Sequence, residues 1–116
     1  MKPGFRYALD AITRIRGVHG AILVAGEDGL IVAESLMEGI RGNAVAALAA
    51  SLYQRFRQAT ETAGVRRPEF LHLQAEQGSL LVVPAPNDVL VVAVAAGDLN
   101  VGLARLEMIR AAEAIT

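Results

Sequence analysis

The sequence has 116 residues, of which 53% are hydrophobic, and its mean hydropathy is +0.40. A chain of this length builds one core, so we expect a single domain over residues 1–116. With 11 Lys and Arg against 12 Asp and Glu, the net charge of −1 argues against attraction to nucleic acid or anionic lipid. The apolar excess indicates a second buried surface, and hence an oligomer.

Two further features of the composition limit the compartment and the chemistry. Cysteine is absent, which removes disulfides, thiolate metal sites and thiol nucleophiles, and favours a reducing compartment. Residues 1–6 lack an apolar signal core, and apolar runs such as 89–96 are far shorter than the roughly 18 residues of a membrane span. We therefore expect a cytoplasmic protein without membrane insertion.

The first half of the chain predicts a helix, a hairpin and a long helix. Apolar residues at three- and four-residue spacing predict a helix over 5–16 that ends at Gly17. Residues 21–25 and 30–33 are typical of strands, and Asp28-Gly29 suits a tight turn between them. A loop over 36–43 then leads into a helix over 44–63, with Asn43 expected as its N-cap.

Two stripes distinguish the sides of this long helix. The stripe assigned to the core consists of Val45, Leu48, Ala49, Leu52, Phe56 and Ala59. A weakly apolar strip is expected on the opposite side, and it consists of Ala46, Ala47, Ala50 and Tyr53. Because such a strip opposite a complete core stripe needs a cover, we expect it to pack against a second copy of the chain. The helix propensity of alanine would also explain it.

The second half of the chain predicts a three-stranded meander and a last helix. Strands are expected over 70–76, 79–83 and 89–96, with turns at Gln77-Gly78 and over 84–88. The last helix follows Gly97-Asp98. Its core face is expected to hold Leu99, Leu103, Leu106, Ile109 and Ala112.

The strand patterns indicate which strands are central. Residues 21–25 and 89–95 do not alternate, so helices should cover both of their faces. In contrast, Leu71, Leu73 and Ala75 alternate with polar residues, which is typical of an edge strand that can pair with another copy. His72 and Gln74 of this strand therefore join the expected dimer interface. The expected α/β fold is a five-stranded antiparallel sheet, in the order α-β-β-α-β-β-β-α, with the terminal helices on one face and the long helix on the other.

This order and four local segments resemble the Roadblock/LC7 family. The segments are Arg16-Gly17-Val18-His19-Gly20, Asp28-Gly29-Leu30-Ile31, the alanine-rich stretch 44–52, and Gln77-Gly78 followed by Leu81-Val82-Val83-Pro84. No single segment is specific, but their order and spacing are distinctive. The resemblance implies the family's profilin-like fold and dimerisation through the middle helix and third strand. In stand-alone bacterial members, such as the gliding-motility regulator, it also implies a Ras-like small GTPase as partner.

Residues that could carry catalysis or hold a metal are few. His19 and His72 are the only histidines, and without cysteine they make a poor metal set. The serines lack a nucleophile-elbow context, and the glycine pairs match no phosphate-loop pattern. Lys2 is the only lysine. We therefore expect no enzyme activity, no cofactor and no metal.

The sequence favours a binding module over the other function classes. We expect a non-catalytic homodimer that binds and regulates a Ras-like small GTPase and has no nucleic-acid partner. The candidates for facing the GTPase, with a merely solvated face as the alternative, are Arg41, Gln54, Arg55, Arg57 and Gln58. The alternative functions are an adaptor subunit of a larger complex and a small-molecule-sensing regulatory domain. A sensing domain predicts a pocket with convergent polar groups between sheet and helix.

Overall fold

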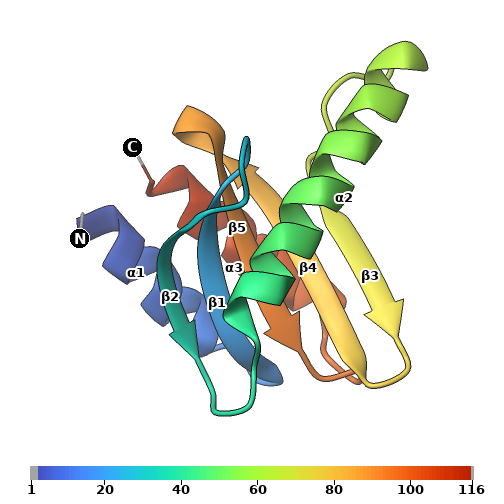
Figure 1. Cartoon of the computed structure of the whole chain (residues 1–116). Coiled ribbons are helices and arrows are strands. Elements are labelled where there is room, and N and C mark those ends of the chain that lie inside the picture. Colours follow the sequence, from blue (N-terminus) through green and yellow to red (C-terminus); the bar gives the residue numbers. More distant parts are fainter. Residues whose placement is uncertain (1–2, 116) are drawn as a thin grey trace.

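A computed structural model describes residues 3–115 as a five-stranded antiparallel sheet covered by helices on both faces (Figure 1). The elements are α1 (Pro3–Thr13), β1 (Val18–Ala25), β2 (Ile31–Leu36), α2 (Gly42–Thr62), β3 (Leu71–Ala75), β4 (Gly78–Ala85), a short 3-10 turn η1 (Pro86–Asp88), β5 (Val89–Ala95) and α3 (Val101–Glu113). The strand order across the sheet is β2-β1-β5-β4-β3. The predicted fold class, including the central position of β1 and β5 and the edge position of β3, is confirmed.

Glycines with positive φ close two of the predicted turns. Gly17, with φ of +95°, lies between α1 and β1, and Gly29, with φ of +75°, closes the β1–β2 hairpin. Residues with a side chain rarely adopt this conformation without strain, so glycine is favoured at both positions. This preference made both turns predictable from the sequence.

The two ends of α2 differ in how they satisfy their backbone groups. At the C-terminal end, Gly64 has φ of +81°, and the N–H groups of Gly64 and Val65 donate to the carbonyls of Glu61 and Thr60 over 3.1 and 2.9 Å. At the N-terminal end the cap is Arg41, without a side-chain hydrogen bond. The predicted Asn43 cap is wrong, because the helix already begins at Gly42.

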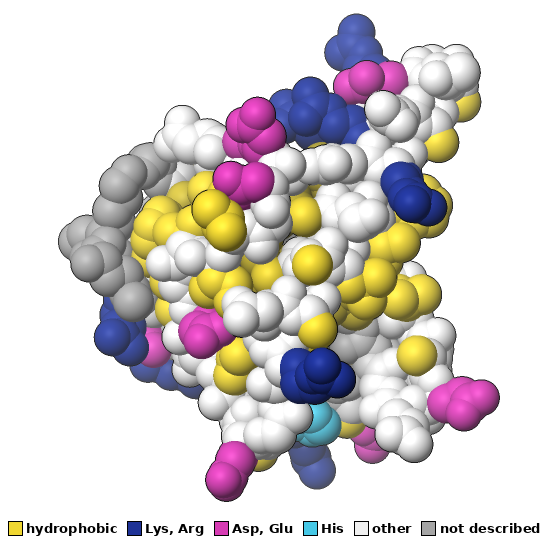
Figure 2. Space-filling view, in the orientation of Figure 1, with side chains coloured by type: hydrophobic (Ala, Val, Ile, Leu, Met, Phe, Trp, Pro, Cys, Tyr) yellow, Lys and Arg dark blue, Asp and Glu magenta, His cyan; other side chains and the backbone are white. Residues whose placement is uncertain are grey.

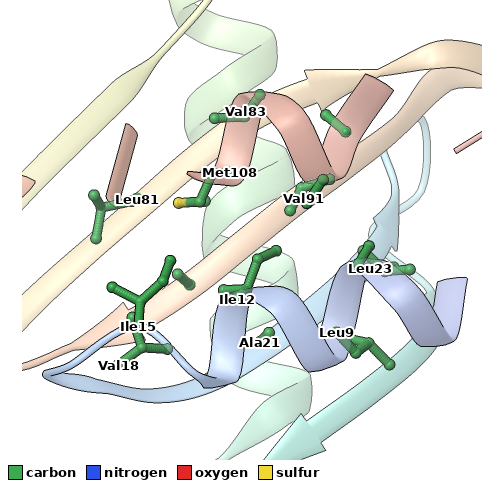
Figure 3. Packing of buried hydrophobic residues seen from close by; sticks show 14 of the residues in the cluster. Leu9, Ile12, Ile15, Val18, Ala21, Leu23, Leu81, Val83, Val91 and Met108 are labelled. Atoms are coloured by element: carbon green, nitrogen blue, oxygen red, sulfur yellow. The ribbon is translucent and has the colours of Figure 1, made fainter. Parts of the chain in front are cut away.

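The terminal helices form one layer of the core. Leu9 and Ile12 of α1 and Met108 of α3 are fully buried against side chains of β1, β4 and β5, including Leu23 and Val91 (Figure 3). Each such side chain contributes about 1.5–3 kcal/mol by leaving water. This layer accounts for the α1–α3 face of the sheet.

The long helix is turned relative to the prediction. The residues of α2 that lie against the sheet are Ala46, Ala49, Ala50 and Tyr53. Of the stripe assigned to the core, Ala49 is buried and Val45 and Leu52 pack partly against the core. Leu48 and Phe56 of that stripe are instead 47% and 49% exposed. The sheet supplies the bulk on this face through Ile22, Val24, Leu80, Val82, Leu90 and Val92. Small helix residues therefore fit where large ones would force α2 away from the sheet.

The predicted core face of the last helix is also partly wrong. The buried residues of α3 are Ala104, Met108, Ala111 and Ala112, whereas Leu103 and Leu106 are 47% and 56% exposed. The end of α3 lies very close to α1: a Cβ added to Gly4 would meet the Ala114 carbonyl oxygen at 2.6 Å. Small side chains permit this approach, as they do under α2.

The edge strand β3 is less covered than its alternation suggests. Register with β4 places Leu71 and Leu73 opposite Val82 and Leu80, on the α2 side of the sheet. Leu71 is half-buried, but Leu73 is 44% exposed. The alternation correctly identifies the apolar face of β3, and α2 leaves part of that face open. Within residues 3–115, no helix combines the length and apolar character that a bilayer span requires.

Candidate interaction surface

The exposed apolar side of α2 forms a continuous stripe, here called the α2 flank. It consists of Leu48, Leu52 and Phe56, which recur every four residues and therefore stack along one side of the helix. Leu52 is half-buried and the other two are exposed. Space-filling side chains show hydrophobic groups gathered along this helix and beside β3 (Figure 2).

The opposite side of α2 is fastened to the β1–β2 turn. The amide of Gln54 donates to the carbonyls of Gly26 and Glu27 over 2.6 and 2.9 Å. Because Gln54 and the α2 flank lie on different sides of the helix, the flank faces away from this turn, toward the edge of the sheet that β3 occupies (Figure 1). The flank and Leu73 are thus exposed on the same face of the sheet.

The two edges of the sheet differ in their readiness to accept another strand. The β1–β2 pairing contains a register shift between Leu23 and Val24, so that edge is irregular. The β3–β4 pairing is regular over all five residue pairs, from Leu71–Val82 to Ala75–Gly78. A bulge disfavours edge-to-edge pairing, so β3 is the better edge for adding a strand.

The residues predicted for the dimer interface separate into three groups. Ala46, Ala50 and Tyr53 are buried in the core of their own chain, so their predicted position on the outside of α2 is wrong. Ala47 is exposed, next to the hairpin turn at Gly29. His72 and Gln74 are exposed on the edge strand, on the opposite sheet face from α2. The His72 ring lies 3.4 Å from the Ser79 hydroxyl.

Tyr53 has a structural task within the chain. Its hydroxyl donates a hydrogen bond to the Pro68 carbonyl over 3.1 Å and so fastens the connection between α2 and β3. Burial raises the pKa of Tyr53 above 10.0, an effect that Arg67 and Arg57 oppose and that Asp88 and Glu61 reinforce. The phenol is therefore held in its neutral, donating form.

The candidates for facing a GTPase are exposed but not equivalent. Gln54 is committed to the hairpin turn, and Arg57 pairs with Glu61 over 3.2 Å. Arg55 and Gln58, three residues apart on the outside of α2, form no hydrogen bond or ion pair within residues 3–115. Arg41 lies at the other end of the helix, at the cap. The structure thus groups all but Arg41 on the second half of α2.

Sequence reasoning missed the α2 flank and Leu73 as surface residues. The stripe itself was recognised, but it was assigned to the core because it is the more apolar side of the helix. The signal that could have corrected this assignment is the alanine content of the other side, since alanines suit close contact with a sheet of large side chains. Within the described part of the chain, no group of three or more His, Asp or Glu side chains is placed to hold a metal.

Comparisons with known proteins agree with this architecture. An uncharacterized protein of Methanocaldococcus jannaschii, MJ0714, is 33% identical over 104 residues, which cover 90% of this chain and 86% of that protein. MglB of Myxococcus xanthus has a similar structure, with a TM-score of 0.86 at 17% identity, covering 98% of this chain and 93% of that one. A structure described as MglB with tetrameric arrangement has a TM-score of 0.86 at 24% identity, covering 99% and 89%.

The family assignment comes from the sequence. The model of the Roadblock/LC7 domain matches residues 6–95, which is more than half of the chain and includes β1 to β5. Members of this family are generally regulatory and not catalytic. The chain belongs to the Roadblock/LC7 domain family.

Proposed function

We propose that this chain is a non-catalytic, cytoplasmic module over residues 1–116 that forms a homodimer and binds and regulates a Ras-like small GTPase. The observation that carries the proposal is the α2 flank, which is exposed beside a regular sheet edge. Exposing Leu48, Phe56 and Leu73 on one face adds no stability to a monomer, because apolar surface in water is unfavourable. A second copy of the same chain, related by a two-fold axis, would cover them.

The geometry of such a dimer follows from the elements involved. The β3 strands of two copies pair and extend the sheet across both chains, while the α2 flanks meet on the face above it. Ala44 and Ser51 border the flank and are small, so the two helices can approach closely. Of the predicted interface residues, the proposal keeps His72 and Gln74 as neighbours of the interface and replaces Ala46, Ala50 and Tyr53 by the α2 flank. Ala47 lies beside the β1–β2 turn, on the other side of α2, and is left out of the interface.

The partner is inferred from the family. Structures of MglB, one of them described as a gliding protein, share this fold, and the resemblance to stand-alone bacterial members implies a Ras-like GTPase. In the proposed dimer, the paired α2 helices bring two copies of Arg55 and Gln58 onto one outer surface. These side chains have no partner within residues 3–115, so they are available to a second protein.

The dimer is tested by charge on the α2 flank. We expect Leu48→Glu to halve the mass that light scattering measures and to keep the circular dichroism of the native protein, because Leu48 is already half exposed in one chain. Leu30→Glu is the matched control, since Leu30 is 65% exposed outside the flank. An unchanged mass for folded Leu48→Glu would refute this interface.

The partner is tested by titration of the GTPase encoded closest to this protein, loaded either with GDP or with a non-hydrolysable GTP analogue. We expect binding in at least one nucleotide state and a change in the rate of GTP hydrolysis. Arg55→Glu combined with Gln58→Glu should weaken binding and leave the dimer intact. Absence of binding in both states would remove the GTPase from the proposal. The small-molecule sensor and the adaptor subunit stay as alternative predictions.

A further inference from the structure

A groove runs along α3, between this helix and the connection of residues 63–70. Two hollows make it up, with volumes of about 650 and 690 Å³. Both are lined by Arg67 and Glu69, so the two hollows are adjacent. From Val101 to Glu113 the groove follows about 18 Å of helix, which suits roughly five residues of extended peptide.

The floor of the groove is apolar. β4 contributes Val83 and Pro84, α3 contributes Val101 and Ile109, and Phe70 precedes β3. Val83 belongs to the buried core, and Phe70, Val101 and Ile109 pack against it, so the floor is fixed in place. The floor offers pockets for apolar side chains, as peptide-binding grooves do.

Exposed apolar side chains extend the floor to its rim. Val65 lines the groove and is 68% exposed. Leu106 lies four residues after Gly102 and three before Ile109, so it shares their side of α3, and it is 56% exposed. Neither residue contributes to the core of its own chain.

The charge of the rim is mainly positive. Arg66, Arg67 and Arg105 line the groove, and within residues 3–115 none of the three forms an ion pair. The two carboxylates of the lining, Glu69 and Glu113, are likewise unpaired there and leave one positive charge in excess. Three unpaired guanidinium groups around one groove are suited to carboxylates, which they bind with paired hydrogen bonds.

The wall that carries two of these arginines is held in a defined conformation. Arg66 has φ of +69°, a strained value for a residue with a side chain. The hydrogen bond from Tyr53 to the Pro68 carbonyl fastens the same segment to α2. On the other wall, the Arg105 guanidinium lies 5.8 Å from the centre of the Phe70 ring, which orients it toward the groove. Both walls are therefore arranged before a ligand arrives.

We propose that this groove binds a short acidic peptide segment of a partner protein, with apolar side chains on the floor and carboxylates on Arg66, Arg67 and Arg105. The groove lies on the α1–α3 side of the sheet, whereas the α2 flank lies on the other side. The two surfaces are independent, so the dimer and the groove can be occupied together and each can fail without the other.

The experiment selects peptides without assuming a sequence. Random short peptides displayed on phage are selected on the full chain, and the selected peptides are synthesised and titrated by fluorescence anisotropy. We expect them to be enriched in Asp, Glu and apolar residues. Arg67→Glu combined with Arg105→Glu should weaken their binding at least about tenfold, because two attractive charges become repulsive. Amide resonances of residues 65–70 and 101–113 should shift on titration.

The matched control is Arg6→Glu combined with Arg14→Glu, which makes the same change in net charge at two exposed positions, one in α1 and one directly after it. This control should bind the peptides as the unchanged protein does. Native circular dichroism of both double variants shows that loss of binding is not loss of fold. The proposal is overturned if selection yields no binding peptides, if they are basic, or if the groove variant binds them undiminished.

Discussion

The hydroxyl of Tyr53 reaches the Pro68 carbonyl, 15 residues further along the chain, from a ring buried against the sheet. It therefore links α2 to the connection that forms one wall of the groove along α3. We expect Tyr53→Phe to lower the free energy of unfolding by about 1 kcal/mol, since one hydrogen bond is lost and the Pro68 carbonyl keeps partial access to water. Urea unfolding measures this change, and an unaltered midpoint would contradict it.

The pKa of Tyr53 makes the same contact depend on pH. Burial raises this pKa above 10.0, so the folded state holds the phenolic proton more tightly than the unfolded state. The resulting stability is complete below pH 10.0 and is lost as pH rises through the folded-state pKa. We expect the unfolding free energy of the unchanged protein to fall more steeply above that pH than that of Tyr53→Phe. Parallel pH profiles would show that Tyr53 does not titrate as described.

At the scale of the element, the orientation of α2 decides which residues can meet a partner. Ala46 is fully buried, whereas its neighbour Ala47 is exposed. We expect Ala46→Leu to lower the unfolding free energy by about 1–3 kcal/mol through overpacking, and Ala47→Leu to leave it nearly unchanged. Denaturation at two protein concentrations separates chain stability from association. Equal effects of the two substitutions would mean that α2 is not oriented as described.

The same helix shows what its sequence could and could not predict. Periodicity located α2 within two residues at each end and found two apolar stripes, although Ala49 is buried with the second stripe and Ala47 of that stripe is exposed. It could not say which side faces the sheet, because a side that covers a sheet and a side that meets another chain are both apolar. The space between α2 and the sheet decides which side of the helix is buried. That space is set by residues far away in the sequence, such as Ile22 and Leu80.

The strands were more predictable than the helix faces. β1 and β5 lack alternation because helices cover both of their sides, and this property is local in sequence. Turn residues such as Gly29 also act locally. The candidate surface depends on how far α2 extends over β3, which leaves Leu73 exposed, and the groove depends on the path of residues 63–70. Neither has a local signature, so both required the structure.

At the scale of the whole molecule, the proposed two-fold axis constrains β3. When two identical strands pair antiparallel about a two-fold axis, the residue nearest the axis lies opposite its own copy. Leu73 is the central residue of Leu71–Ala75 and is exposed on the side of the α2 flank. A charge at this position therefore meets the same charge from the partner, and like charges directly opposite each other weaken strand pairing.

This geometry predicts a pair of complementary variants. Leu73→Lys and Leu73→Glu should each be mainly monomeric by light scattering, and an equimolar mixture should form a heterodimer, since the opposing charges then attract across the axis. A tag on one variant identifies the heterodimer by native mass spectrometry, and added salt should weaken it. The same pair of substitutions at Leu30, which is exposed outside this surface, should leave both proteins dimeric. If the Leu73 mixture associates no more than either variant alone, β3 does not pair about this axis.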